Sequence, residues 1–154
     1  QEPGGWRVGG RMSGEGIPRY ENHIRLSETE TDEWGFPQLV FSIDYGENDV
    51  KMMEDYLEKG LEIMEAAGVK NIRTSDNNQN PGLDIHEMGG VRMGKDPKTS
   101  ILNKWNQVHS CKNVFVTDGA CMTTVSTQNP SLTFMAITAR AANYAVEEMS
   151  KGNL

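Results

Sequence analysis

The alternation of apolar and polar residues predicts two β-strands in the first third of the chain. They cover residues 20–27 and 38–45, where apolar side chains recur at every second position, as in a sheet with one buried face. The apolar members are Ile24 and Leu26 in the first strand and Leu39, Phe41, Ile43 and Tyr45 in the second. An acidic turn over 28–36 lies between them, so we expect an antiparallel hairpin with a long connection.

An apolar spacing of three and four residues predicts a long helix over 49–67. The positions on its apolar face are Val50, Met53, Leu57, Leu61 and Met64. Asn48 or Asp49 can cap the start, and Gly68 suits a left-handed end. Lysine and glutamate fill the opposite face, so we expect this helix to pack on a sheet and assign it no chemistry.

Two segments show neither the alternation typical of a strand nor the three- and four-residue spacing typical of a helix. Residues 1–16 are too rich in glycine for a helix and do not alternate, which indicates an irregular segment. Residues 73–82 are polar and mark the one plausible internal boundary. We therefore expect two parts, over 1–75 and 76–154.

The last third of the chain predicts a strand and a second long helix. Residues 113–118 form a continuous apolar run, which is typical of a strand buried on both faces. Pro130 opens a helix that runs to about Lys151, and Gly152 ends it. The expected fold class is therefore α+β, with an antiparallel sheet and at least two long helices.

Composition excludes several classes of protein. Charged residues make up 24% of the chain and hydrophobic residues 36%, as in a globular domain. The net charge is −7 and no Lys/Arg cluster is present, so nucleic acid is not expected as a partner. No apolar run approaches the ~18 residues of a membrane span, and no signal peptide is visible. Cys111 and Cys121 fit neither a zinc spacing nor a disulfide framework, so both are expected to be reduced thiols.

Candidate chemistry begins in the glycine turn, defined as residues 86–94. His86 has the side chain of a general base, although a histidine in a turn can equally be a plain hydrogen-bonding residue. Gly89, Gly90 and Gly94 let the backbone bend and approach a bulky ligand closely. Arg92 offers either a fixed donor to a ligand or one half of a structural ion pair.

A second candidate lies at the start of the final helix. Asn129 and Pro130 are preferred residues for an N-cap and a first helical position, so capping alone explains them. The same geometry presents the free N–H groups of Ser131 and Leu132, with the positive end of the helix dipole behind them, to an anionic ligand. Both interpretations remain open at this point.

Asp118 and Gly119 follow the predicted strand at its carboxyl end. That is where α/β sheets place ligand contacts. An acid followed by glycine is equally ordinary turn chemistry.

Taken in order, these pieces resemble the C-terminal signature of the glucose–methanol–choline (GMC) family of flavin oxidoreductases. The matching blocks are residues 86–94, 96–103, 113–120 and 129–133. The match is dense over 81–150 and extends more thinly to 14–22. Four blocks in register are a far more specific signal than any one of them.

The resemblance implies a catalytic pair. His86 would accept the proton of a substrate alcohol, and Asn129 would orient that hydroxyl. The hydride would pass from the carbinol carbon to FAD, which supplies the redox chemistry. The substrate would be a small-molecule alcohol, in particular a sugar or polyol, while the alcohol itself and the electron acceptor stay open.

The resemblance also implies a cofactor surface and no metal. The cofactor-binding residues would be Asp118, Gly119, Pro130, Ser131 and Leu132. The strand over 113–118 and the final helix would complete a Rossmann-like FAD domain, and residues 1–75 would belong to the substrate domain. The Gly-x-Gly-x-x-Gly of that domain does not occur here as a strand, turn and helix. We therefore expect an N-terminal FAD-binding region as partner, without which this chain is inactive.

Two other classes remain as alternatives. In a non-catalytic module, His86 and Asn129 would only hydrogen-bond a polyol. In a metal protein, the ligands would come from His23, His86, His109 and Cys111, although their spacings match no ligand motif.

Overall fold

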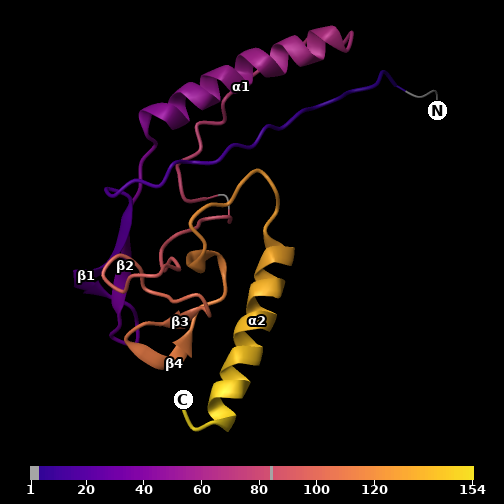
Figure 1. Ribbon diagram of the computed structural model, residues 1–154. Helices are drawn as coiled ribbons and strands as arrows, with labels where there is room; N and C mark the ends of the chain where they lie inside the picture. The colour runs from indigo at the N-terminus through magenta and orange to yellow at the C-terminus, as the bar shows by residue number, and fades with distance from the viewer. Residues whose placement is uncertain (1–3, 84) are drawn as a thin grey trace.

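The computed structural model describes residues 4–83 and 85–154, and this part of the chain is α+β, as predicted (Figure 1). The elements are β1 (His23–Thr31), β2 (Pro37–Ser42), α1 (Glu47–Ala66), β3 (Gln107–Val108), β4 (Cys111–Phe115), the 3-10 turn η1 (Gly119–Cys121) and α2 (Ser131–Ser150). The strands form two separate two-stranded antiparallel sheets, β1–β2 and β3–β4. The predicted boundary over 73–82 has no regular structure, and the division into two parts stays a prediction.

β1 and β2 form the predicted antiparallel hairpin. Ile24 pairs with Phe41 and Leu26 with Leu39, so the apolar residues share one face. The predicted ends were wrong, because β1 begins at His23 and β2 already ends at Ser42. The reason is Asn22, whose side-chain amide donates to the Asp44 carbonyl oxygen at 3.1 Å and accepts from the Asp44 N–H at 3.1 Å. These side-chain bonds replace the ladder at the open end of the hairpin.

The predicted first helix is α1, but its start is built differently. Gly46 occupies the N-cap, and Asp49 lies inside the first turn, where its carboxylate accepts the Gly46 N–H at 2.7 Å. The predicted caps, Asn48 or Asp49, were therefore wrong. Gly68 has φ +76°, and its N–H donates to the Glu65 carbonyl oxygen at 2.9 Å. The predicted left-handed end is confirmed.

The prediction that α1 packs on a sheet was wrong. In Figure 1, α1 stands apart from both sheets and the N-terminal arm (residues 4–19) runs beside it. Tyr56 Oη donates to the Ser13 carbonyl oxygen at 2.8 Å, and a Cβ on Gly14 would lie 2.5 Å from Met52 Sδ. Periodicity identifies the apolar face of a helix but does not identify what covers it. The arm itself is irregular, as predicted.

The core of the described chain lies between α2 and the loops before it. Leu102 and Cys121 are fully buried there, and Ala141 on α2 is nearly so. Trp105 stacks on Tyr144 of α2 with ring centroids 4.7 Å apart and planes at 6°, which fixes the helix to the β3–β4 region. These contacts hold α2 beside the loops that carry the candidate chemistry (Figure 1).

The strand predicted over 113–118 lies earlier in the sequence than expected, and the prediction that both its faces are buried was wrong. β4 ends at Phe115, and its residues up to Val114 are exposed. The only strand paired with it in the described part is β3, and Phe115 packs edge-on against Tyr144 with centroids 6.3 Å apart. A continuous apolar run indicates that a strand is suited to burial, but it does not show which residues cover the strand.

α2 confirms the predicted final helix. Pro130 is its N-cap, and Gly152 follows its end with φ +73°. An exposed apolar stripe runs along the side turned away from the core, at alternating spacings of three and four. Its members are Leu132, Met135, Ala139, Ala142, Val146 and Met149. Among the described residues, no helix combines the length and the apolar character needed to cross a membrane.

Candidate functional site

The glycine turn lies directly beside η1. The Val91 N–H donates to the Ala120 carbonyl oxygen at 2.9 Å, and the Met93 N–H donates to that of Cys121 at 3.0 Å. Gly89 has φ +88°, a conformation that favours glycine. The bond between Val91 and Ala120, 29 positions apart, therefore joins two of the blocks identified in the sequence through their backbones.

At Gly119, the glycine turn and α2 both come close to the backbone of η1. A Cβ at that position would lie 3.0 Å from both the Glu87 carbonyl oxygen and Met88 Sδ, and 3.3 Å from Phe134 Cζ. The absence of a side chain at Gly119 thus allows the glycine turn, η1 and the first turns of α2 to meet. Two of the four predicted blocks and the residue directly after a third therefore meet at one place.

The two residues of the predicted catalytic pair adjoin the segments that meet here. His86 is half-buried and opens the glycine turn, and Asn129 is exposed immediately before Pro130. The interpretation of Asn129 as a helix cap was wrong, because Pro130 is the N-cap and no side chain caps the helix. The Asn129 carboxamide is therefore not used by the helix. Convergence of the two side chains on one substrate hydroxyl stays a prediction.

The helix start has the predicted open donors. The first intrahelical bond runs from the Phe134 N–H to the Pro130 carbonyl oxygen at 3.0 Å, so the N–H groups of Ser131 and Leu132 precede the ladder. Pro130 is buried, whereas Ser131 and Leu132 are exposed. This end of α2 can accept an anionic group from outside the described chain.

Asp118 stabilises a turn in this structure. Its Oδ1 accepts the Ala120 N–H at 3.0 Å and so caps η1. Since the capping bond occupies a single oxygen of an exposed carboxylate, it is compatible with a ligand contact. The cofactor contact of Asp118 and Gly119 remains a prediction.

Sequence reasoning missed the polar network behind the glycine turn. Asn106 is fully buried with φ +64°, and its Nδ2 donates to the Val116 carbonyl oxygen at 3.0 Å. Arg140 Nη2 on α2 donates to Asn106 Oδ1 at 2.9 Å and lies 3.8 Å from Met93 Sδ. The signal available in the sequence was an arginine bordering the apolar face of the final helix, next to Ala141. This network fixes α2 to the end of the glycine turn.

Cys121 lies in the same interior. Burial raises the pKa of its thiol, while a hydrogen bond from Asn106 and the charge of Arg140 act in the opposite direction. Both cysteines are free, Cys111 at the surface and Cys121 fully buried, as expected for reduced thiols.

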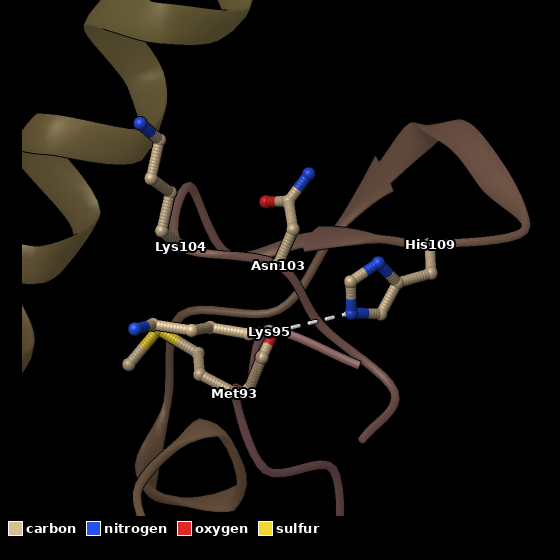
Figure 2. A pocket seen from close by; sticks show the side chains of 6 residues that line it. Met93, Lys95, Asn103, Lys104 and His109 are labelled. Atoms are coloured by element: carbon tan, nitrogen blue, oxygen red, sulfur yellow. Dashed lines mark hydrogen bonds between the residues drawn. The ribbon is translucent and has the colours of Figure 1, made fainter. Parts of the chain in front are cut away.

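A surface pocket of about 410 Å³ lies at the end of the glycine turn (Figure 2). Its lining residues are Met93, Gly94, Lys95, Asn103, Lys104 and His109. Figure 2 shows His109 Nε2 bonded to the Gly94 carbonyl oxygen, at 3.3 Å, and the same nitrogen lies 3.2 Å from Ser100 Oγ. His109 therefore joins two loops. Over residues 4–83 and 85–154, no three His, Cys, Asp or Glu side chains form a group that could hold a metal.

Comparison with known proteins decides the family. A family profile described as GMC oxidoreductase, for its C-terminal part, matches residues 18–138. This chain belongs to the GMC oxidoreductase family. The match includes the glycine turn, η1 and the first turns of α2.

Curated relatives cover most of this GMC chain. It is 33% identical over 140 residues to 2-methyl-1,2-propanediol dehydrogenase of Mycolicibacterium austroafricanum, covering 90% of the chain and 25% of that protein. It is 30% identical over 140 residues to the fructose dehydrogenase large subunit of Gluconobacter japonicus, covering 88% and 24%. It is 32% identical over 125 residues to paromamine 6′-oxidase of Streptomyces fradiae, covering 81% and 23%. The GMC chain thus spans about a quarter of the length of these relatives.

Proposed function

We propose that this chain is the C-terminal, substrate-side part of an FAD-dependent oxidoreductase that oxidises an alcohol, and specifically a sugar or polyol. The observation that carries the proposal is the meeting of the glycine turn, Gly119 and Phe134 at one place, where His86 immediately precedes Glu87 and Asn129 immediately precedes the N-cap of α2. Membership of the GMC family supports it. So do the three relatives, which are named as dehydrogenases of a diol and of fructose and as an oxidase of paromamine.

His86 acts as the general base in this proposal. An alcohol is a poor hydride donor until its hydroxyl proton is being lost, and an imidazole side chain is suited to accept that proton. Asn129 presents a carboxamide that the helix does not use, and it orients the hydroxyl toward His86. FAD, when bound, would accept the hydride from the carbinol carbon.

The residues present fit a flavin. The start of α2 offers the N–H groups of Ser131 and Leu132 beside buried Pro130, with the helix dipole behind them. Negative charge at a helix N-terminus is stabilised by about 0.3–1 kcal/mol. Asp118 and Gly119 would lie beside the ribityl–pyrophosphate portion, where Asp118 offers an exposed carboxylate.

An N-terminal FAD-binding region completes this site in the proposal. The apolar stripe of α2 is exposed, with Leu132 at 79%, Met135 at 68% and Val146 at 67% exposure. Apolar surface of this extent is typical of an interface. With that region in place, β4 and α2 would become part of a Rossmann-like FAD domain, and the hairpin β1–β2 part of the substrate domain.

Steady-state turnover of the intact protein tests the proposal. A panel of sugars and polyols is supplied with an artificial electron acceptor, and His86→Gln is compared with His23→Gln. His23 is the matched control, because it is an exposed histidine on β1 whose ring Nδ1 lies 2.7 Å from the Glu21 carbonyl oxygen. Loss of a general base lowers kcat by roughly 10²- to 10⁴-fold, whereas the control keeps wild-type turnover. Binding of a polyol without turnover of any panel member would instead support the non-catalytic module.

A further inference from the structure

The N-terminal arm reaches the loop that leads to Asn129. Glu15 Oε1 accepts the N–H of Val125 at 2.9 Å, across 110 positions of sequence. Both residues are half-buried. In the described part of the chain, this is the one hydrogen bond that joins residues 123–129 to another segment.

The arm is anchored to α1 on both sides of Glu15. Two residues before it, the Ser13 carbonyl oxygen accepts from Tyr56 Oη at 2.8 Å. Two residues after it, the Ile17 N–H donates to Asp49 Oδ1 at 3.4 Å. Asp49 is itself buried and bonded to the start of α1. The Glu15 carboxylate therefore projects from backbone that a twenty-residue helix holds in place.

The loop that receives this bond has little support of its own. Residues 123–129 contain no regular structure, and Ser126 has φ +61°. All of them except Val125 are exposed. Val125 is thus the inward-facing point of the loop, four positions before Asn129.

We propose that Glu15 is a positioning residue for Asn129. This inference rests on the proposed function of Asn129 in orienting the substrate hydroxyl. By accepting the Val125 N–H, the carboxylate sets the path of the loop and with it the direction of the Asn129 side chain. The anchored arm thereby connects α1 to the loop that carries Asn129.

The test uses the intact holoenzyme and three variants. Glu15→Ala removes the acceptor, Glu15→Gln keeps an acceptor oxygen of the same reach, and Ser13→Ala is the matched control. The control removes a side chain of the same arm but keeps the backbone carbonyl that bonds Tyr56. A misplacement of about 1 Å at a reacting group costs about 10²-fold. We therefore expect Glu15→Ala to lower kcat by roughly ten- to a hundredfold.

Two further readouts separate positioning from a general structural role. Glu15→Gln restores most of the lost kcat, and Glu15→Ala keeps the visible flavin spectrum and the substrate KM. In the Asn129→Ala background, adding Glu15→Ala lowers kcat little further, because the residue through which Glu15 acts is gone. Amide hydrogen exchange at Val125 becomes faster in Glu15→Ala and stays slow in Ser13→Ala.

Several results would overturn the inference. One is an unchanged kcat in Glu15→Ala. Another is a kcat in the Glu15→Ala/Asn129→Ala double variant that is lowered by the product of the two single effects. The third is a Glu15→Gln variant with a kcat as low as that of Glu15→Ala. If wild-type enzyme turns over no polyol, the proposed function fails instead. Exchange at Val125 then still decides whether Glu15 holds the loop.

Discussion

Gly94 closes the glycine turn against Ser100, and the structure predicts what happens when that space is filled. A Cβ at Gly94 would lie 2.7 Å from Ser100 Cβ and 2.8 Å from Ser100 Oγ. Ser100 has little freedom to move, because it is buried and its Oγ donates to the Asp96 carbonyl oxygen at 2.7 Å and lies 3.2 Å from His109 Nε2. Gly94 is held as well, since its N–H donates to the carbonyl oxygen of buried Leu102 at 2.8 Å.

Gly94→Ala is therefore an overpacking substitution, with an expected cost of about 1–3 kcal/mol in the free energy of unfolding. Gly90→Ala is the matched control in the same turn, because a Cβ there meets nothing within 4 Å. Alanine at such a compatible site is neutral or stabilises by about 0.4–1 kcal/mol. Denaturant titration followed by circular dichroism measures both changes.

A double-mutant cycle ties the loss to the contact. Ser100→Gly removes the atoms that clash with the new Cβ, so the Gly94→Ala/Ser100→Gly double variant should be more stable than the sum of the single effects predicts. Equal stability of Gly94→Ala and Gly90→Ala, or strict additivity in the cycle, would refute the packing described for this turn.

Two further predictions concern the interior behind the site. Replacing Arg140 by methionine leaves the side-chain oxygen Oδ1 of buried Asn106 without its donor at 2.9 Å, so the free energy of unfolding should fall by about 1–3 kcal/mol. Asn143→Ala, at an exposed position of α2, should change it little, and equal effects of the two substitutions in denaturant titration would contradict the assignment. Thiol labelling of the native protein should modify exposed Cys111 and spare Cys121 until unfolding, since burial raises the pKa of Cys121. Because that pKa lies above the unfolded value of about 8.5, the stabilising contribution of protonated Cys121 is complete below pH about 8.5 and is lost as the pH rises through the folded pKa; rapid labelling of Cys121 at neutral pH would contradict this.

The local elements could be predicted because their causes are local. The period of the α1 face, Pro130 before α2 and the left-handed glycine Gly68 each act within a few residues, and the structure confirms the elements that they predict. The burial of β4 and the partner of α1 were predicted wrongly. Both depend on contacts with segments distant in the sequence, which a local pattern does not specify.

The candidate site likewise has features that local sequence patterns predict and features that they do not. The blocks around His86, Asp118 and Asn129 carry local sequence patterns, and the structure brings the first two together through backbone bonds. The bonds from the Val125 N–H to Glu15 and from Arg140 to Asn106 leave no such pattern, because each joins two single groups across a long separation in the sequence. Long-range polar contacts of this kind are visible only once the chain is folded.

Direct observation of flavin reduction tests the central claim. The intact protein is mixed anaerobically with a panel of sugars and polyols, and the visible absorption of oxidised flavin is followed in a single turnover. The account predicts bleaching by at least one member, slowed several-fold by deuterium on the carbinol carbon and slowed by roughly 10²- to 10⁴-fold in His86→Gln. Absorption that no member of the panel changes, or bleaching at the wild-type rate in His86→Gln, would contradict it.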